Sequence, residues 1–572
     1  MAIALNAQRC AIVYNLEIFR TILSDSGRIR MTDVLIIGNG GAGLVAALSA
    51  KEAGAEVTVL GKGYPTRSQT CMAQGGINAA MGNVSDDSVE RHVADTLRSA
   101  QGLASEKAVD ILCGEAVDAM LWLDRIGVPF SRTPEGRIAQ RHLGGAYSPR
   151  ACYAQDYTGL KILHTLYDTC NKAGIAFLNE RFLLNLISRE KEKGGREVLG
   201  ATVLNIRTGE VEEHRAKTVI LATGGYSRLY GKHSTNAVGS TGDGVAAAIR
   251  AGARLSDMEF VQFHPTGLKN SAVLISESAR GAGGYLLNAR GERFTDEKGT
   301  RDVVARAILE EIEKSGAVTL DIRHLGERFI DEELPQERKL AKLYEGVDPV
   351  HEPMPIRPVA HYTMGGIEVD CDSQTCVEGL YAAGECANHR VHGANRLGGN
   401  SLLELIVFGK QAGSSAAEAA KACSRDVEAL SDQLAKDSNF VIGVKHFTNQ
   451  IDFYEKRTFM GNIFYNNAGM VRDDMGLKAV LGAVRQMQKE LPFMGPKDKS
   501  KAYNTNLVEF IEFGNLVELA EIVLVSAISR VESRGAHYRS DAPQRNDQMF
   551  MAHTITWKED GVLCADFVAN KE

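Results

Sequence analysis

Short apolar runs, glycine turns and a helical stretch alternate from residue 32 onward. Residues Thr32–Leu60 read TDVLIIGNGGAGLVAALSAKEAGAEVTVL, which is an apolar run, a glycine turn, an alanine-rich stretch and a second apolar run. This order predicts a β-α-β unit. Two later apolar runs, Thr218–Gly225 and Gly379–Glu385, also end in glycine-rich turns. They predict further strands of the same parallel sheet, whose carboxyl ends collect ligands.

Three glycines in the first turn occupy the positions of a G-x-G-x-x-G motif. Gly38 permits a tight turn, Gly40 lets the backbone approach a pyrophosphate, and Gly43 lets the helix pack on the strand. The start of the helix would present unpaired N–H groups to the phosphates. The second run ends at Val59–Lys62 without the Asp or Glu that holds the ribose of NAD. The motif therefore predicts dinucleotide binding and favours FAD.

The spacing of these segments predicts an α/β fold with a Rossmann-like FAD-binding domain that is interrupted. We expect residues 1–30 to be an N-terminal extension, because they lack a clean apolar core and a small-residue cleavage site. The domain boundaries follow from the changes of pattern: FAD-binding domain 31–255 and 356–424, an α+β capping domain 256–355, a helical subdomain 425–545 with apolar residues at three- and four-residue spacing, and a C-terminal tail 546–572.

Composition narrows the class of partner. The 572 residues are 44% hydrophobic and 24% charged, which permits a large core, and a net charge of -7 without a basic run argues against nucleic acid. The 10 Cys are scattered, so we expect no zinc, iron–sulfur or other metal site and a reducing compartment. No apolar run is long enough to span a bilayer. We expect a cytoplasmic protein that is peripheral on the membrane only through partner subunits.

Four segments place histidine, arginine and hydroxyl residues among glycines: QFHPTGL, ISESARGAGGYLLNARGERF, GTRDVVAR, and PVAHYTMGG together with HGANRLGGNSLLE. Arginine offers a planar bidentate fork and histidine a directional donor, so this chemistry suits a small dicarboxylate. A charge-assisted hydrogen bond contributes about 1.5–3 kcal/mol, so a doubly charged substrate held away from water needs several such donors.

Seven segments in chain order resemble the flavoprotein subunit of succinate dehydrogenase and fumarate reductase: PTRSQTCMAQGG, HPTG, RGAGGYLLNARGERF, RDVVAR, HYTMGGI, HGANRLGGNSLLELIVFG and ESRGAHYRSDAPQRND. The resemblance covers nearly the whole chain from about Thr32. It implies a flavoprotein catalytic subunit that interconverts fumarate and succinate by hydride transfer with N5 of FAD. It also implies a separate iron–sulfur subunit as partner, with a membrane-anchor or a soluble donor subunit beyond it.

The resemblance implies a role for each matching residue. The substrate carboxylates would be held by His264, Ser276, His361 and Arg396, and Ser276 stands where the family usually has Thr. Arg301 would donate or accept the proton, fed from solvent through Glu277 and Arg280. FAD would be held by Gly38, Asn39, Gly40, Gly41, Ala42, Gly43, Gly61, Lys62, Ser68, Gln69, Thr70, Gln74, Gly75, Gly76, Asp243, Glu385, Ser401 and Leu402.

An arginine as acid–base catalyst needs a physical reason, because its ordinary pKa is above about 12. A second guanidinium nearby and the exclusion of water would both disfavour the charged form of Arg301, and the carbanion formed from the substrate is itself a strong base. The clamped carboxylates would polarise and twist the double bond, so positioning and electrostatics would supply much of the acceleration.

Gln69 departs from the family pattern, in which a histidine at this position is bonded to the flavin 8α-methyl group. A glutamine amide is not a nucleophile, and no histidine occurs between Gln69 and His92. Alternation along an extended segment would put Cys71 on the same side as Gln69, which leaves a thioether as an alternative. We predict that FAD is bound without a covalent bond. The covalent link raises the flavin potential in this family, so its absence predicts that fumarate reduction is favoured.

Two other functions compete with this one. L-aspartate oxidase shares segments like AQGG, HPT and HGANR, but Gly398–Ser401 and the segment RHLGGAYSPRACYAQDYTG are more similar to the dehydrogenase and reductase group. The chain could also be a non-catalytic flavoprotein or assembly scaffold. That interpretation is disfavoured because the proton relay and both carboxylate clamps are present.

Overall fold

The computed structural model describes residues 31–192, 194–428 and 431–570, so the predicted extension 1–30 lies outside the described residues. The predicted β-α-β unit is confirmed as β1, α2 and β2, which span Thr32–Ile37, Gly41–Glu52 and Val57–Gly61. The two strands are parallel, with Val34 beside Val57. The glycine turn therefore lies at the carboxyl edge of a parallel sheet, where ligands bind in open α/β folds.

A seven-stranded sheet forms the base of the molecule, in the order β6-β2-β1-β9-β8-β7, with β16 paired to β9. The two further strands expected from the sequence are confirmed, because β9 runs parallel to β1 and β16 runs parallel to β9. The bounds of the added strands are β6 Ala176–Asn179, β7 Arg181–Glu190, β8 Arg196–Asn205, β9 Glu210–Leu221 and β16 Leu380–Ala382.

Two long helices pack against each other beside this sheet. Helix α12 (Asn400–Lys421) lies along α2, and their apolar residues share a buried core with Ile36 and Ile220 of the sheet. The rest of this side of the molecule consists of α3 Val89–Ser99, α4 Glu106–Gly114, α5 Ala116–Arg125, α6 Thr158–Lys172 and the short strands β3 Ile77–Asn78, β4 Gln140–Arg141 and β5 Ala151–Cys152.

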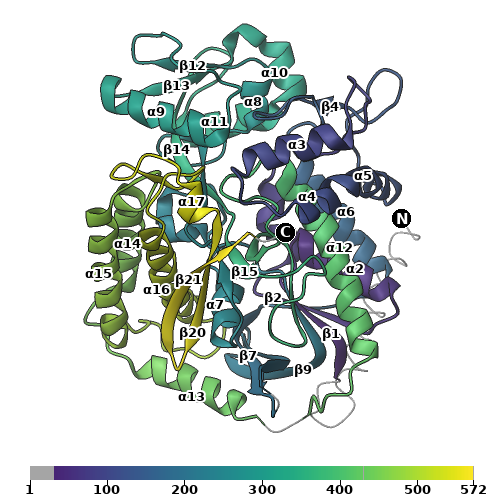
Figure 1. Ribbon diagram of the computed structural model, residues 1–572, viewed down its shortest axis with the longest axis vertical. Helices are drawn as coiled ribbons and strands as arrows, with labels where there is room; N and C mark the ends of the chain where they lie inside the picture. The colour runs from purple at the N-terminus through teal and green to yellow at the C-terminus, as the bar shows by residue number, and fades with distance from the viewer. Residues whose placement is uncertain (1–30, 193, 429–430, 571–572) are drawn as a thin grey trace, which may run out of the picture.

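A second, antiparallel sheet lies at the top of Figure 1 and has its own core, which includes Leu286, Leu320 and Ile356. We call the region β11 to β14 the cap. Its sheet order is β11-β14-β13-β12. The elements are β11 Val261–Leu268, α8 Glu277–Gly281, β12 Tyr285–Asn288, α9 Arg301–Ser315, β13 Val318–Asp321, α10 Glu327–Glu333, α11 Pro335–Glu345 and β14 Met354–Thr363.

Helices dominate the region after residue 432, on the left of Figure 1. Its buried centre is α16, which begins at Thr505, ends at Ser529 and carries apolar residues almost all round. The others are α13 Gln433–His446, α14 Phe453–Asn467 and α15 Asp474–Glu490, with the strand pair β18 Val471–Arg472 and β19 Tyr538–Arg539. None of the helices in the described part of the chain is both long enough and apolar enough to cross a bilayer.

The last described residues, expected as a tail, form a hairpin of β20 (Ala552–Glu559) and β21 (Val562–Ala569) after the short helix α17 (Asp547–Phe550). Strand β20 pairs with β10 (Leu255–Ser256), in a sheet that also holds β15 (Gly366–Glu368) and β17 (Ala387–Asn388). The end of the chain therefore packs against α16 and α7 (Asp243–Arg250).

Candidate active site

A cavity of about 860 Å³ extends from the glycine turn to the cap. Its size falls within the range of small-molecule and cofactor sites. The lining comes from the seven-stranded sheet, the segment 61–76, the cap and α16. All the predicted site residues line it except Gly43 and Arg280. Predicted residues as far apart in the chain as Gly38 and Leu402 therefore line the same cavity.

The glycine turn has the shape that a dinucleotide requires. A Cβ on Gly43 would lie 1.9 Å from the Gly38 carbonyl oxygen, so only glycine lets α2 start this close to β1. Gly40 and Gly41 line the cavity at the start of α2, whose first-turn N–H groups have no carbonyl partner within the helix. The Gly41 N–H donates to Thr70 Oγ1 at 3.0 Å. Ser68 Oγ, also in the lining, is buried and has no partner among the described residues. These features fit the pyrophosphate of FAD.

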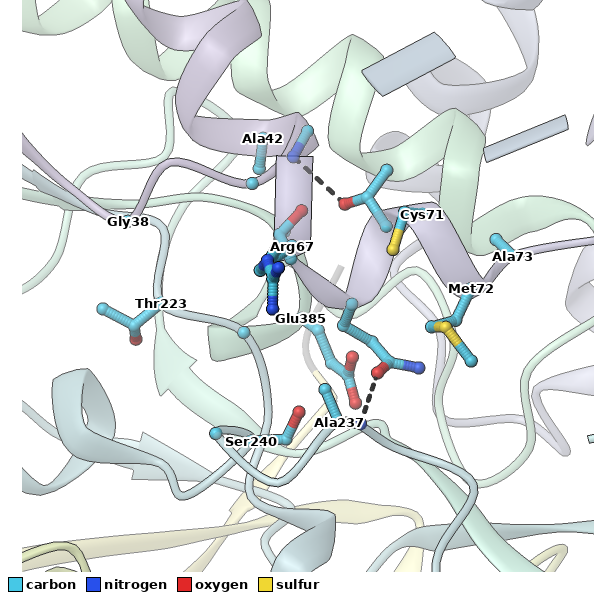
Figure 2. A pocket seen from close by; sticks show the side chains of 18 of the residues that line it. Gly38, Ala42, Arg67, Cys71, Met72, Ala73, Thr223, Ala237, Ser240 and Glu385 are labelled. Carbon is cyan, nitrogen blue, oxygen red and sulfur yellow. Dashed lines mark hydrogen bonds between the residues drawn. The ribbon is translucent and has the colours of Figure 1, made fainter. Parts of the chain in front are cut away.

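Gln69 lies in a 3₁₀ helix, η2 (Gln69–Met72), and not in the extended segment that the sequence suggested. Its Oε1 accepts a hydrogen bond from the Ala237 N–H at 2.7 Å, which Figure 2 shows as a dashed line, and its Nε2 donates to Asn236 Oδ1 at 3.3 Å. The two-residue alternation that would put Cys71 beside Gln69 therefore does not hold. Burial also raises the pKa of Cys71, which disfavours its thiolate.

The strand-end position that carries an acid in NAD-binding proteins is Lys62, and two carboxylates bind it. Lys62 Nζ lies 2.7 Å from Asp243 Oδ2 and 2.7 Å from Glu512 Oε1. Burial alone would lower the pKa of Lys62, but these two charges raise it. Glu512 lines the cavity from α16 and escaped the sequence analysis, because nothing near residue 512 marks a nucleotide site. Glu385, another lining residue, has its pKa raised to about 7 by burial.

Two histidines form one wall at the cap end, with ring centroids 5.0 Å apart. Burial lowers the pKa of His264 well below 6.5, and the charge of Arg301 adds to this; the same two causes lower the pKa of His361. Both rings are therefore neutral near pH 7. The Thr266 N–H donates to His264 Nδ1 at 3.2 Å, so the neutral His264 ring carries its proton on Nε2. His264 can thus donate one hydrogen bond to a ligand without carrying charge.

Ser276 precedes α8, and its Oγ accepts hydrogen bonds from the Ser278 N–H and hydroxyl at 3.2 and 2.8 Å. Its own hydroxyl hydrogen is left to donate. Because Ser276 is buried and lines the cavity, that donor is available to a bound anion.

Arg301 begins α9, and a buried carboxylate holds its guanidinium. Glu277 Oε2 accepts from Arg301 Nε and Nη2 at 3.1 and 2.7 Å, while Glu277 Oε1 accepts from Arg280 Nη2 at 3.2 Å. Burial would raise the pKa of Glu277, but the two arginines outweigh it and lower the pKa. A Cβ on Gly398 would lie 2.5 Å from Glu277 Oε2. Glycine there leaves room for the Arg301–Glu277–Arg280 array.

Arg396 lines the cavity and has hydrogen-bond donors that no described residue uses. Its Nε and Nη2 atoms are buried and have no hydrogen-bond partner among the described residues. Burial lowers its pKa to about 10, with a further contribution from the charge of Arg301. The guanidinium carbon lies 4.2 Å from the centre of the Tyr362 ring. Arg396 therefore remains charged near pH 7 and presents unused N–H groups, the arrangement that a carboxylate ligand needs.

Gln262 joins the two arginines and was missed from the sequence. Its Oε1 accepts from Arg301 Nη1 at 3.0 Å, and its Nε2 donates to the Arg396 carbonyl at 2.8 Å and to Asn395 Oδ1 at 2.9 Å. The available signal was a fully polar amide in an apolar strand that also carries His264, because a buried amide requires partners.

The fold and the cavity together define an FAD-dependent oxidoreductase. A family model described as an FAD binding domain matches residues 33–402, and one described as fumarate reductase flavoprotein C-term matches residues 457–564. The chain belongs to the succinate dehydrogenase and fumarate reductase flavoprotein family, and it is an enzyme of that class.

Individual relatives agree with this assignment. A succinate dehydrogenase flavoprotein subunit of Rickettsia conorii is 40% identical, over 92% of each chain. An 8-methylmenaquinol:fumarate reductase flavoprotein subunit of Wolinella succinogenes is 39% identical, over 93% of this chain and 89% of the relative. Among solved structures, a quinol fumarate reductase chain of E. coli matches with a TM-score of 0.89 at 35% identity, covering 94% of this chain and 97% of the other.

Proposed function

We propose that this enzyme reduces fumarate to succinate in the cavity between the seven-stranded sheet and the cap, with FAD bound without a covalent bond. The observation that carries the proposal is the convergence of two arginines, two neutral histidines and a serine on one buried space beside the glycine turn. FAD, when bound, supplies hydride at N5. The side chains of the protein bind and orient the substrate and supply the proton.

The donors divide between the two ends of a dicarboxylate. Arg396 offers its unpartnered Nε and Nη2 hydrogens to one carboxylate, and His264 offers its Nε2 hydrogen. His361 and Ser276, which also line the cavity, would bind the other carboxylate. Because the histidines are neutral, the charge of the bound substrate is balanced mainly by Arg396, whose pKa of about 10 keeps it protonated near pH 7.

Arg301 is the proton donor in this proposal. The chain Arg301–Glu277–Arg280 leads away from the cavity, since Arg280 does not line it and donates to the Glu297 carbonyl at 2.6 Å. Glu277 touches both guanidinium groups, so it can receive a proton from Arg280 and return one to Arg301. Proton transfer by positioned groups of this kind contributes about 10²–10⁴-fold to a rate.

Gln69 supports the non-covalent state of the cofactor. Both ends of its amide are engaged by the loop at 236–237, so the side chain serves to tie that loop to η2. Without a histidyl bond the flavin keeps a lower potential and gives electrons more readily than it takes them, which favours fumarate as acceptor over succinate as donor. This is the reason for proposing a direction.

An electron donor must then reach the flavin from another chain. We propose an iron–sulfur subunit as that partner, with a membrane-anchor or soluble donor subunit beyond it. The proposal rests on the family and on the absence, among the described residues, of any cluster of Cys and His that could hold a metal.

Assays of the purified protein in both directions test the reaction. We expect fumarate reduction by reduced viologen to exceed succinate oxidation when the donor and the acceptor provide equal driving force. Faster succinate oxidation would contradict the proposed direction. Oxygen-dependent oxidation of L-aspartate without fumarate reduction would instead establish an aspartate oxidase, and activity in none of these assays would favour the scaffold.

Acid precipitation tests the state of the cofactor. We expect the flavin to appear in the supernatant and none to remain with the pellet. A Gln69→Ala variant serves as the matched control, because it removes the amide but should release the same fraction of flavin. Flavin that stays with the parent polypeptide, at Cys71 or elsewhere, would contradict the proposal.

A further inference from the structure

One aromatic ring separates Arg396 from a buried carboxylate that the mechanism does not use. The Tyr362 ring lies under the Arg396 guanidinium, with its centre 4.2 Å from the guanidinium carbon. At its far end, the Tyr362 hydroxyl donates to Glu404 Oε2 at 2.5 Å. Both Tyr362 and Arg396 line the cavity, whereas Glu404 lies behind them in α12. The Arg396 guanidinium and the Tyr362 ring therefore lie between the cavity and Glu404.

Glu404 is fixed from its other sides. His392 Nε2 lies 2.9 Å from the same oxygen, and His389 Nδ1 lies 3.9 Å from Glu404 Oε1. His389 Nε2 is in turn 2.9 Å from Ser373 Oγ. All four side chains are buried. The Tyr362 hydroxyl therefore donates to an acceptor that is held in place, so Glu404 fixes the position of the hydroxyl end of the ring.

The guanidinium of Arg396 is held in an unusual way. A buried arginine is ordinarily oriented by hydrogen bonds to its own protein, but Nε and Nη2 of Arg396 have none among the described residues. The Tyr362 ring provides attraction through its face and leaves the N–H groups in the guanidinium plane unused. An acceptor at the hydroxyl makes the ring more electron-rich, which strengthens that attraction.

We propose that Tyr362 and Glu404 are positioning residues for the substrate: Glu404 fixes the Tyr362 ring, and the ring holds the Arg396 fork ready for a carboxylate. This inference rests on the proposed function only in that Arg396 clamps the substrate. It adds two residues to the binding machinery, and one of them does not reach the cavity at all.

A tyrosine at this position could also serve only to fill space in the core. The test must therefore distinguish a loss of packing from a loss of Arg396 orientation. Malonate, a dicarboxylate that cannot be reduced, reports binding alone when its dissociation constant is measured through the absorbance change of the enzyme-bound flavin. We expect Tyr362→Leu to weaken malonate binding about tenfold, or about 1.4 kcal/mol. Tyr362→Phe and Glu404→Gln should each weaken it about threefold. The KM for fumarate should rise more than kcat falls.

The decisive measurement is the coupling to Arg396. If Tyr362 acts through Arg396, the Arg396→Gln/Tyr362→Phe double variant binds malonate no more weakly than Arg396→Gln alone. A purely structural role predicts that the two losses add, and that result would overturn the inference. Tyr362→Phe changes one hydroxyl, which keeps the test valid even if Tyr362→Leu fails to fold.

A matched control loses a buried tyrosine hydroxyl elsewhere. Tyr230 is fully buried, donates to the Ala468 carbonyl at 3.0 Å and does not line the cavity, so Tyr230→Phe should leave malonate binding unchanged. Equal losses in Tyr230→Phe and Tyr362→Phe would refute the positioning role. If Arg396→Gln itself leaves malonate binding unchanged, the carboxylate clamp of the proposed function fails. If only the Tyr362 and Glu404 variants have no effect, the positioning inference alone fails.

Discussion

Gln262 offers a sharp perturbation of the site, because one amide contacts both arginine segments. Gln262→Leu removes the acceptor of Arg301 Nη1 and the donor to Asn395 and to the Arg396 carbonyl. The bond to the charged group contributes about 1.5–3 kcal/mol and the two neutral bonds about 0.5–1.5 kcal/mol each. Burying leucine returns about 1.5–3 kcal/mol. We expect the free energy of unfolding to fall by about 1–3 kcal/mol.

The expected effect on catalysis is larger than on stability. Arg301 keeps its two bonds to Glu277 but loses the one that fixes its outer nitrogen, and a misplacement of about 1 Å can cost about 10²-fold. We therefore expect kcat for viologen-linked fumarate reduction to fall about 10–100-fold, with FAD content unchanged. Urea unfolding and initial rates measure the two quantities on the same preparation.

A second buried glutamine gives the control. Gln140 also makes three hydrogen bonds, to Ala79, Arg150 and Asn83, and it does not line the cavity. Gln140→Leu should lose comparable stability and keep kcat within twofold of the parent. If Gln262→Leu behaves in the same way, the placement of Arg301 does not depend on Gln262 and the reasoning is refuted.

Three further changes test other parts of the account. Burial lowers the pKa of His92 to about 4, below its unfolded value near 6.5, so the free energy of unfolding should fall by about 2 kcal/mol between pH 7 and pH 5. In urea unfolding at both pH values, the His92→Gln variant should lose less of its free energy of unfolding over this range than the parent. An equal loss in the two proteins would contradict this. Gly43→Ala should yield no folded flavoprotein by circular dichroism and flavin absorbance, whereas Gly114→Ala, with open space at its Cβ, should fold normally. Glu512→Gln should weaken FAD binding severalfold in titrations of the apoprotein, since Lys62 keeps only one carboxylate; unchanged affinity would remove Glu512 from the cofactor site.

Local pattern sufficed for the strands that carry the site. The run that forms the end of β9 and the run that forms β16 are buried on both faces and are followed by glycine turns, which is typical of a buried parallel strand. The conformation of residues 69–72 could not be derived in the same way. Its 3₁₀ turn is accompanied by bonds from Gln69 to Asn236 and Ala237, which are more than 160 residues away. Side chains alternate between two sides with a period of two residues only in an extended strand, and residues 69–72 do not form one.

The sequence predicts the side chains that would bind the substrate, but not the distant residues that contact them or hold the cofactor site. Histidine and arginine among glycines are conspicuous, so His264, Arg301 and Arg396 were found and line one cavity. Glu512 was not, because its meaning depends on a contact with Lys62 across 450 residues. The terminal hairpin had a usable local signal in Asp560–Gly561 between two alternating runs. Its pairing with β10, nearly 300 residues earlier, had none.

The most direct test of the central claim is the rate of fumarate reduction by an Arg301→Ala variant with reduced viologen as donor, compared with the parent at equal FAD content. The account predicts a loss of at least about 100-fold, because no other side chain in the proposed relay would supply the proton at that position. A variant that reduces fumarate within twofold of the parent rate would contradict the assignment of Arg301 as proton donor.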